Sequence, residues 1–246
     1  MTILLPPRST PVQAPRSTPV QVPAFEDTDA RLRLLVPHAP RVYAVARIDD
    51  EPRRRWWRLA DPDRDRRIAL LYARALEDVA DPRIAADQVA AALVHVVAGR
   101  VLAPYLLEAR CWDPGLDNLW IHQDSDGGID WAAVADDTLR VLPDDPAADE
   151  TVVVLPCEEA LARWTAHRAT TALHAAYASL ARCAPVEQPR LWSLLGRTVV
   201  AGAAQIPLLA GTSRAVAARR GQLLLDAFLA LGVPVRGLCK LGKASL

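Results

Sequence analysis

The fold of this chain is decided by residues Leu191–Leu238, which read LWSLLGRTVVAGAAQIPLLAGTSRAVAARRGQLLLDAFLALGVPVRGL. Apolar residues recur in this stretch at steps of three and four, the spacing of one face of an α-helix. Pro207 and Gly211 interrupt the pattern and are expected to stop the first helix. The stretch therefore predicts two packed helices, the second over Arg214–Leu231.

Further helices are predicted upstream of this pair. Asp61 and Asp81 each precede a proline, and this combination of a capping side chain and a first-turn proline is typical of a helix start. The segment Ile84–Ala98 is apolar nearly all round, which indicates a buried central helix, and its His95 is interpreted as a core histidine rather than a ligand. Periodic apolar residues predict a long helix over Glu158–Arg182.

After the central helix, Gly99 and Pro104 are expected to break or kink the chain.

Short β-elements are predicted between the helices. Asn118–Gln123 and Ile129–Trp131 flank the turn DSDGG and predict a β-hairpin. Val42–Ile48 and Thr151–Leu155 are candidate short strands. The predicted fold class is α+β, mainly α-helical with a small antiparallel β-hairpin or sheet.

The N-terminus differs in composition from the rest of the chain. The heptapeptide PRSTPVQ occurs at residues 7–13 and again at 15–21, and prolines this dense prevent both helix and central strand. Residues 1–24 are therefore predicted to be a disordered, proline-rich tail. Residues 25–246 are predicted to form a single domain, since their length is sufficient for one large core.

Charge and hydropathy limit the classes of partner. The 29 basic and 29 acidic residues cancel, so no overall field favours nucleic acid or an anionic membrane. The basic, tryptophan-containing run RRRWWR at 53–58 is flanked by aspartates, and nucleic-acid binding is not predicted for it. No apolar run approaches the roughly 20 residues that span a bilayer. A cytoplasmic protein without a transmembrane segment is expected.

The sequence gives no signature of a metal centre or of a known catalytic class. The four cysteines, Cys111, Cys157, Cys183 and Cys239, are scattered and form no CxxC pair, which argues against a compact zinc or iron–sulfur site. A disulfide framework is not expected in a reducing cytosol. The motifs GxSxG, GxxxxGK[ST] and GxGxxG are absent. No reaction is assigned on this basis.

Four segments together resemble the ferric-siderophore reductases of the FhuF type. They are the alanine-rich helix Asp87–Val97, DNLWIH at 117–122, LWSLLGRTVVAGA at 191–203 and RRGQLLLDAFLALGVPVRG at 219–237. The resemblance covers roughly residues 60–238 and implies that residues 25–246 form one helical domain of that type. It also implies a protein that handles iron or siderophores.

The end of the sequence departs from that family. Its members continue into a paired Cys and a CxxC whose thiolates hold a 2Fe–2S cluster, whereas this chain ends in GLCKLGKASL with Cys239 alone. No cofactor is therefore assigned, and a cluster is not expected. The resemblance implies a groove that receives a ferric siderophore or a similar small molecule, lined by Trp192, Arg197, Arg214, Arg219 and Arg220, with His167 and His174 opposite.

Three hypotheses follow from this resemblance. The first is a siderophore-binding or accessory protein without a cluster. The second is a ferric-siderophore reductase that uses an atypical cluster or an external redox partner. The third is an enzyme or scaffold of a natural-product pathway that uses the same fold for another small molecule.

Overall fold

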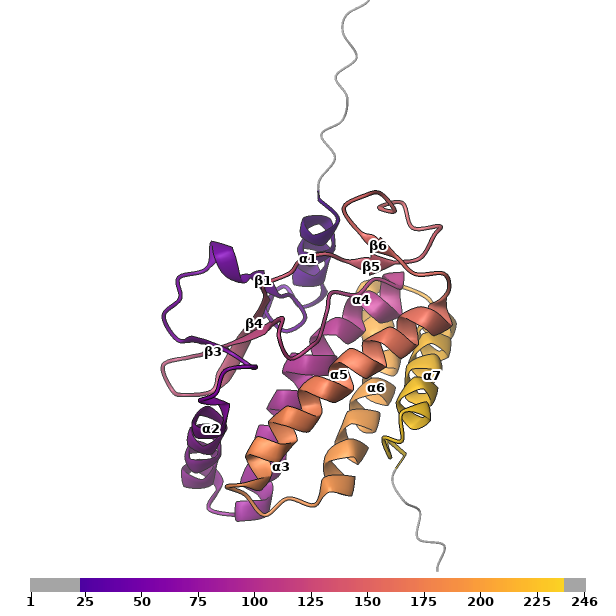
Figure 1. Cartoon of the computed structure of the whole chain (residues 1–246). Helices are drawn as coiled ribbons and strands as arrows, with labels where there is room; N and C mark the ends of the chain where they lie inside the picture. The colour runs from indigo at the N-terminus through magenta and orange to yellow at the C-terminus, as the bar shows by residue number, and fades with distance from the viewer. Residues whose placement is uncertain (1–22, 237–246) are drawn as a thin grey trace, which may run out of the picture.

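The computed structural model describes residues 23–236, in which a bundle of long helices lies beside a small β-sheet (Figure 1). The prediction of a mainly helical α+β fold is confirmed. The predicted tail over residues 1–24 lies almost wholly outside the described residues. One large apolar cluster extends from Phe25 in the first helix to Val235 after the last.

Seven α-helices and two shorter helical turns are described within residues 23–236. The α-helices are α1 (Ala24–Leu35), α2 (Arg64–Val79), α3 (Pro82–Val94), α4 (Arg100–Glu108), α5 (Glu158–Ala181), α6 (Gln188–Ala210) and α7 (Arg214–Ala230). The shorter turns are the 3-10 helix η1 (Ile48–Asp50) and the π-helical turn η2 (His95–Gly99).

The central element is a continuous helical rod made of α3, η2 and α4, which passes through the core. Asp81 caps its start as predicted, since its carboxylate accepts hydrogen bonds from the backbone N–H groups of Arg83 at 2.8 Å and Ile84 at 3.0 Å. At Gly99 the expected irregularity takes the form of a π-turn, in which the N–H of Arg100 donates to the carbonyl of His95. The break expected at Pro104 was wrong. The rod continues through Pro104 to Glu108.

The start of α2 was predicted too early. The helix begins at Arg64 and not at the Asp61-Pro62 pair. The carboxylate of Asp61 instead accepts the backbone N–H of Arg58 at 3.1 Å and closes the turn that follows the second strand. A side chain committed to that turn is unavailable for capping the helix.

The three C-terminal helices pack together, and α7 contacts both α5 and α6. The prediction that Pro207 stops α6 was wrong, because the helix runs through this residue to Ala210 and ends at Gly211 with φ 64°. After α7 the chain crosses α6 at Gly196. A Cβ at that position would lie 2.0 Å from the carbonyl oxygen of Val235, so only glycine fits.

The predicted hairpin is confirmed and forms the centre of a four-stranded sheet in the order β1-β4-β3-β2. The pairings β2–β3 and β3–β4 are antiparallel, whereas β1 pairs parallel with β4. A second sheet has two parallel strands, β5 and β6. The strands are β1 (Ala46–Arg47), β2 (Trp56–Arg58), β3 (Leu119–Gln123), β4 (Ile129–Val134), β5 (Arg140–Val141) and β6 (Val153–Val154).

The four-stranded sheet separates two apolar clusters. Residues Trp57, Leu119 and Ile121 belong to the main core. On the other face, the register places His122 between Trp56 and Trp131, and these two tryptophans belong to a smaller cluster. The alternation of side chains along each strand therefore creates a tryptophan-rich outer face.

Two helical stretches have the length and composition to cross a membrane. In the most apolar 18-residue stretch of the rod Pro82–Glu108, 83% is buried, as expected of a core helix. In the corresponding stretch of α6, only 33% is buried. The core helix of a soluble protein can have the same length and composition as a membrane span, so the expected absence of a transmembrane segment stays a prediction.

The crossing at Gly196 gives a test of the C-terminal packing. We expect Gly196→Ala to lower the free energy of unfolding by about 1–3 kcal/mol, because the new methyl group overlaps the Val235 carbonyl. Gly202→Ala is the matched control on the same helix. Its Cβ would meet nothing closer than 3.4 Å, and the helix propensity of alanine should leave stability unchanged or raised. Urea denaturation of both variants measures the difference, and equal stabilities would contradict the crossing.

Candidate functional site

The π-turn η2 interrupts the central rod beside two polar side chains, those of His95 and Arg100. A π-turn widens a helix locally, and such turns are frequent at functional sites. The imidazole of His95 lies over Gly99, where a Cβ would come within 2.5 Å of the ring Nδ1. The glycine therefore makes room for the histidine one turn before it.

His95 is held by one backbone contact. Its Nε2 lies 2.8 Å from the carbonyl oxygen of Val42, which can only accept a hydrogen bond, so Nε2 carries the proton. The ring of Tyr43 meets it edge to face at 6.2 Å. Burial lowers the pKa of His95 to about 4, and the neighbouring Arg100 guanidinium acts in the same direction. The imidazole is therefore neutral at pH 7.

Arg100 is a buried cation, only 2% exposed. Its guanidinium donates to the backbone carbonyls of Arg41, Ala44 at 2.7 Å and Asp130 at 3.2 Å. No carboxylate oxygen of the described residues lies within ion-pair distance of it, and its buried Nε has no acceptor there. Burial lowers the pKa of Arg100 to about 10, so the group still carries its charge at pH 7.

Charged and aromatic side chains lie next to each other at the solvent side of His95 and Arg100. The Asp130 carboxylate lies 3.2 Å from the Arg41 guanidinium and 2.6 Å from Nδ1 of His122. The guanidinium of Arg41 also lies over the indole of Trp131, 4.1 Å from the ring centroid. The side chain of Arg41 is 52% exposed, so it can approach a ligand from the solvent side.

These groups surround a hollow of about 450 Å³ between the segment 39–42, the π-turn and the start of β4. Its lining consists of Ala39, Pro40, Arg41, Val42, His95, Arg100, Ile129 and Asp130. A second hollow of about 260 Å³, between α2, α3 and the hairpin turn, shares the side chain of Ile129. With two arginines, one aspartate and a neutral histidine, the larger hollow has an excess of positive charge. We call it the π-turn hollow.

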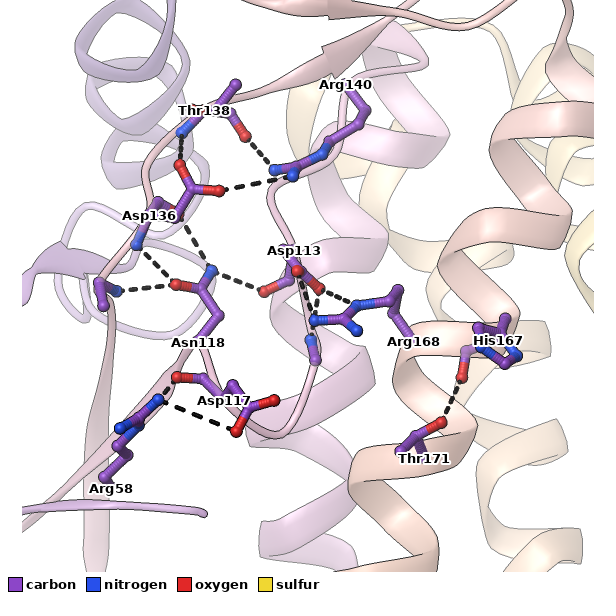
Figure 2. Close-up of polar contacts among 12 residues, drawn as sticks. Arg58, Asp113, Asp117, Asn118, Asp136, Thr138, Arg140, His167, Arg168 and Thr171 are labelled. Carbon is purple, nitrogen blue, oxygen red and sulfur yellow. Dashed lines mark hydrogen bonds and ion pairs between the residues drawn. The ribbon is translucent and has the colours of Figure 1, made fainter. Parts of the chain in front are cut away.

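A second polar network fixes the loop that leads into β3 (Figure 2). Both carboxylate oxygens of Asp113 accept from the guanidinium of Arg168 on α5, at 2.8 and 2.7 Å. The side chain of Asn118 donates to the carbonyls of Asp113 and Asp136 and accepts the N–H groups of Ala135 and Asp136. Every hydrogen-bonding position of this amide is used, so the network positions the hairpin and offers little to a ligand.

The predicted groove residues lie on α5, α6 and α7, and the structure brings some of them together. The rings of His174 and Trp192 meet at 4.7 Å, but Trp192 is only 3% exposed and belongs to the core. Arg219 and Arg220 both pair with Glu158 at the start of α5. Arg220 also donates to the carbonyl of Leu106.

The other three predicted groove residues are exposed to solvent, each on a different helix. They are His167, Arg197 and Arg214. In Figure 2, His167 lies apart from the Asp113 network, and its backbone carbonyl accepts the hydroxyl of Thr171 at 3.1 Å. None of the seven predicted residues lines the π-turn hollow. Their role in ligand binding stays a prediction.

The π-turn hollow was not predicted from the sequence. His95 was interpreted as a core histidine, and its hydrogen bond to Val42 agrees with that interpretation. A signal was nevertheless present, since Arg100 is the one charged residue in the apolar run from Val89 to Leu107. A charged residue inside such a run must find buried partners or a ligand.

The thiols of the described residues do not fit an iron–sulfur cluster. Cys111 is fully buried, its sulfur lies 3.2 Å from the hydroxyl of Thr165, and burial raises its pKa to about 12. Cys157 is exposed and Cys183 partly buried. Within residues 23–236, no group of three or more His, Cys, Asp or Glu side chains could hold a metal ion. Cys239 lies outside this range.

No family model, no curated protein and no solved structure matches the chain. The resemblance to the ferric-siderophore reductases therefore stays a prediction.

The low pKa of His95 predicts a dependence of stability on pH. The unfolded chain takes up a proton near pH 6.5 and the folded chain only near pH 4, so stability is complete above pH 6.5 and falls as the pH drops towards 4. We expect a loss of about 2–3 kcal/mol from this group. Urea unfolding of the wild type and His95→Gln at pH 7 and pH 4.5 isolates it, since glutamine does not titrate. An equal loss in both proteins would contradict the assignment.

Proposed function

We propose that this protein binds an anionic small molecule in the π-turn hollow. The observation that carries the proposal is the buried guanidinium of Arg100, which donates to backbone carbonyls and has no carboxylate of the described residues within ion-pair distance. The Asp130 carboxylate in the same hollow offsets one of the two positive charges there, those of Arg41 and Arg100. A charge in this situation favours an anion in the adjacent space. The volume of about 450 Å³ lies within the range of small-molecule sites.

The chemistry of the rim supports the same class of ligand. Arg41 can pair with carboxylate or catecholate oxygens, and the exposed half of its side chain leaves that geometry open. The neutral imidazole of His95 adds no negative charge, and its N–H is already donated to the carbonyl of Val42. The buried indole of Trp131 lies beneath Arg41 and supports its guanidinium at the rim.

Together with the family resemblance, these features favour a ferric siderophore or a related chelate as the ligand. A siderophore-binding or accessory protein is thus the function we propose. A ferric-siderophore reductase would need a redox centre that the described thiols do not supply, and it remains the alternative for a protein with an external donor. An enzyme or scaffold of a natural-product pathway would bind the iron-free molecule in preference to its ferric form.

Calorimetric titration with a ferric tris(catecholate) chelate tests the proposal. We expect Arg41→Ala to weaken binding about ten- to a hundredfold, since it removes one charge-assisted contact. Arg53→Ala is the matched control, because Arg53 is equally exposed and also lies over a tryptophan, at 4.8 Å from Trp120, but does not line the hollow.

Two outcomes would contradict this assignment. Failure of the wild-type protein to bind the chelate would reject the ligand class. Loss of binding in the double variant Arg197→Ala, Arg214→Ala, with unchanged binding in Arg41→Ala, would move the site to the groove predicted on α6 and α7. Repeating the titration with the iron-free chelate separates siderophore handling from the natural-product alternative.

A further inference from the structure

The π-turn hollow adjoins a second hollow. Ile129, the first residue of β4, lines both the π-turn hollow and the hollow of about 260 Å³ between α2, α3 and the hairpin turn. We call the second one the hairpin hollow. Its apolar lining consists of Leu71, Ala75, Val89, Ala92 and Ile129. The two hollows therefore meet at one apolar side chain.

The accessible face of the central rod runs along both hollows. Four rod residues between positions 88 and 106 are not buried, and they are Gln88, Ala91, Ala92 and His95. Gln88 and Ala92 line the hairpin hollow and His95 lines the π-turn hollow, at steps of four and three that place all three on one helix face. The rod thus forms one wall of an elongated site, which extends about 10 Å from Gln88 to His95 at 1.5 Å per residue.

At the π-turn end of this site, positive charge is in excess. Arg41 and Arg100 line the hollow together with one carboxylate, that of Asp130. Arg100 is 2% exposed, and its Nε has no hydrogen-bond partner in the described part of the chain. Because a buried donor without a partner costs free energy, this end is suited to an anionic group.

At the hairpin end, negative charge is in excess. Asp78, Asp124 and Asp126 line the hairpin hollow together with a single arginine, Arg74. The Arg74 guanidinium lies 3.3 Å from the carboxylate of Glu77, which does not line the hollow. Within residues 23–236, none of the three aspartates forms an ion pair. This end is therefore suited to a cationic group.

We propose that the ligand of the π-turn hollow is a chain-like molecule whose anionic group lies beside Arg100 and whose other end is an alkylammonium group in the hairpin hollow. The inference rests on the proposed function and adds a second charged group to the ligand. The alkyl chain would pass Ile129 and Ala92, which are apolar. An extended eight-carbon chain spans about 10 Å from a carboxylate to a terminal nitrogen, which matches the length of the site.

Chemical-shift titration of the full ¹⁵N-labelled chain with 8-aminooctanoate and with octanoate tests the inference. We expect 8-aminooctanoate to bind about tenfold more tightly, because its ammonium group pairs with the aspartates of the hairpin hollow. The pair 4-aminobutanoate and butanoate is the length control. Four carbons do not reach the hairpin hollow, so the amino group should bring no gain there.

Two double variants locate the ammonium group. Asp78→Asn, Asp126→Asn removes two charges from the hairpin hollow at constant side-chain size, and should abolish the preference for 8-aminooctanoate without changing the affinity for octanoate. Asp144→Asn, Glu150→Gln is the matched control, because these exposed residues between β5 and β6 line neither hollow. This control should keep the preference.

The outcomes separate this inference from the proposed function. Equal binding of octanoate and 8-aminooctanoate, both weakened by Arg41→Ala, would leave the anion site intact and overturn the inference. A preference for 8-aminooctanoate that survives Asp78→Asn, Asp126→Asn, or an equal gain in the four-carbon pair, would overturn it as well. Binding of neither eight-carbon probe, or binding that Arg41→Ala leaves unchanged, would reject the anion site and both proposals with it.

Discussion

The guanidinium of Arg100 ties three separate parts of the structure together. It lies on the central rod, and its donors reach the carbonyls of Arg41 and Ala44 in the segment before β1 and that of Asp130 in β4. These segments are far apart in the chain, and the hydrogen bond from His95 to the carbonyl of Val42 and the ion pair of Arg41 with Asp130 join them as well. Because a buried cation must keep its hydrogen bonds, this residue fixes the distance between the helical bundle and the sheet.

The π-turn and the outer face of the sheet depend on the same constraint. One extra residue in the helical turn brings His95 over Gly99 and leaves the next residue, Arg100, directed to the segment 41–44. That segment continues into β1, which pairs with β4, and β4 supplies both Asp130 and Trp131. The polar rim and the hollow thus lie directly beside this helical irregularity.

Local signals predicted the helices and the hairpin but not these contacts. The Asp81-Pro82 start and the DSDGG turn were interpreted correctly, because the groups that define them are close in sequence. The α2 start was misplaced since Asp61 bonds to the strand before it. Partners at long separations, such as Asp113 and Arg168, are set by tertiary packing, and residue types alone do not disclose them.

The candidate groove illustrates the same limit for function. The arginines on helices α6 and α7 were predicted to bind an anionic ligand. Arg219 and Arg220 instead form ion pairs with Glu158, the first residue of α5. Their sequence pattern would be identical in either role.

The two helical stretches that are long and apolar enough to cross a membrane differ in how much of each is buried. The rod Pro82–Glu108 and α6 have similar composition, but the first is enclosed by the fold and the second lies at its edge. The apolar side chains of the enclosed rod therefore contribute to the core, whereas part of the apolar surface of α6 stays exposed to solvent.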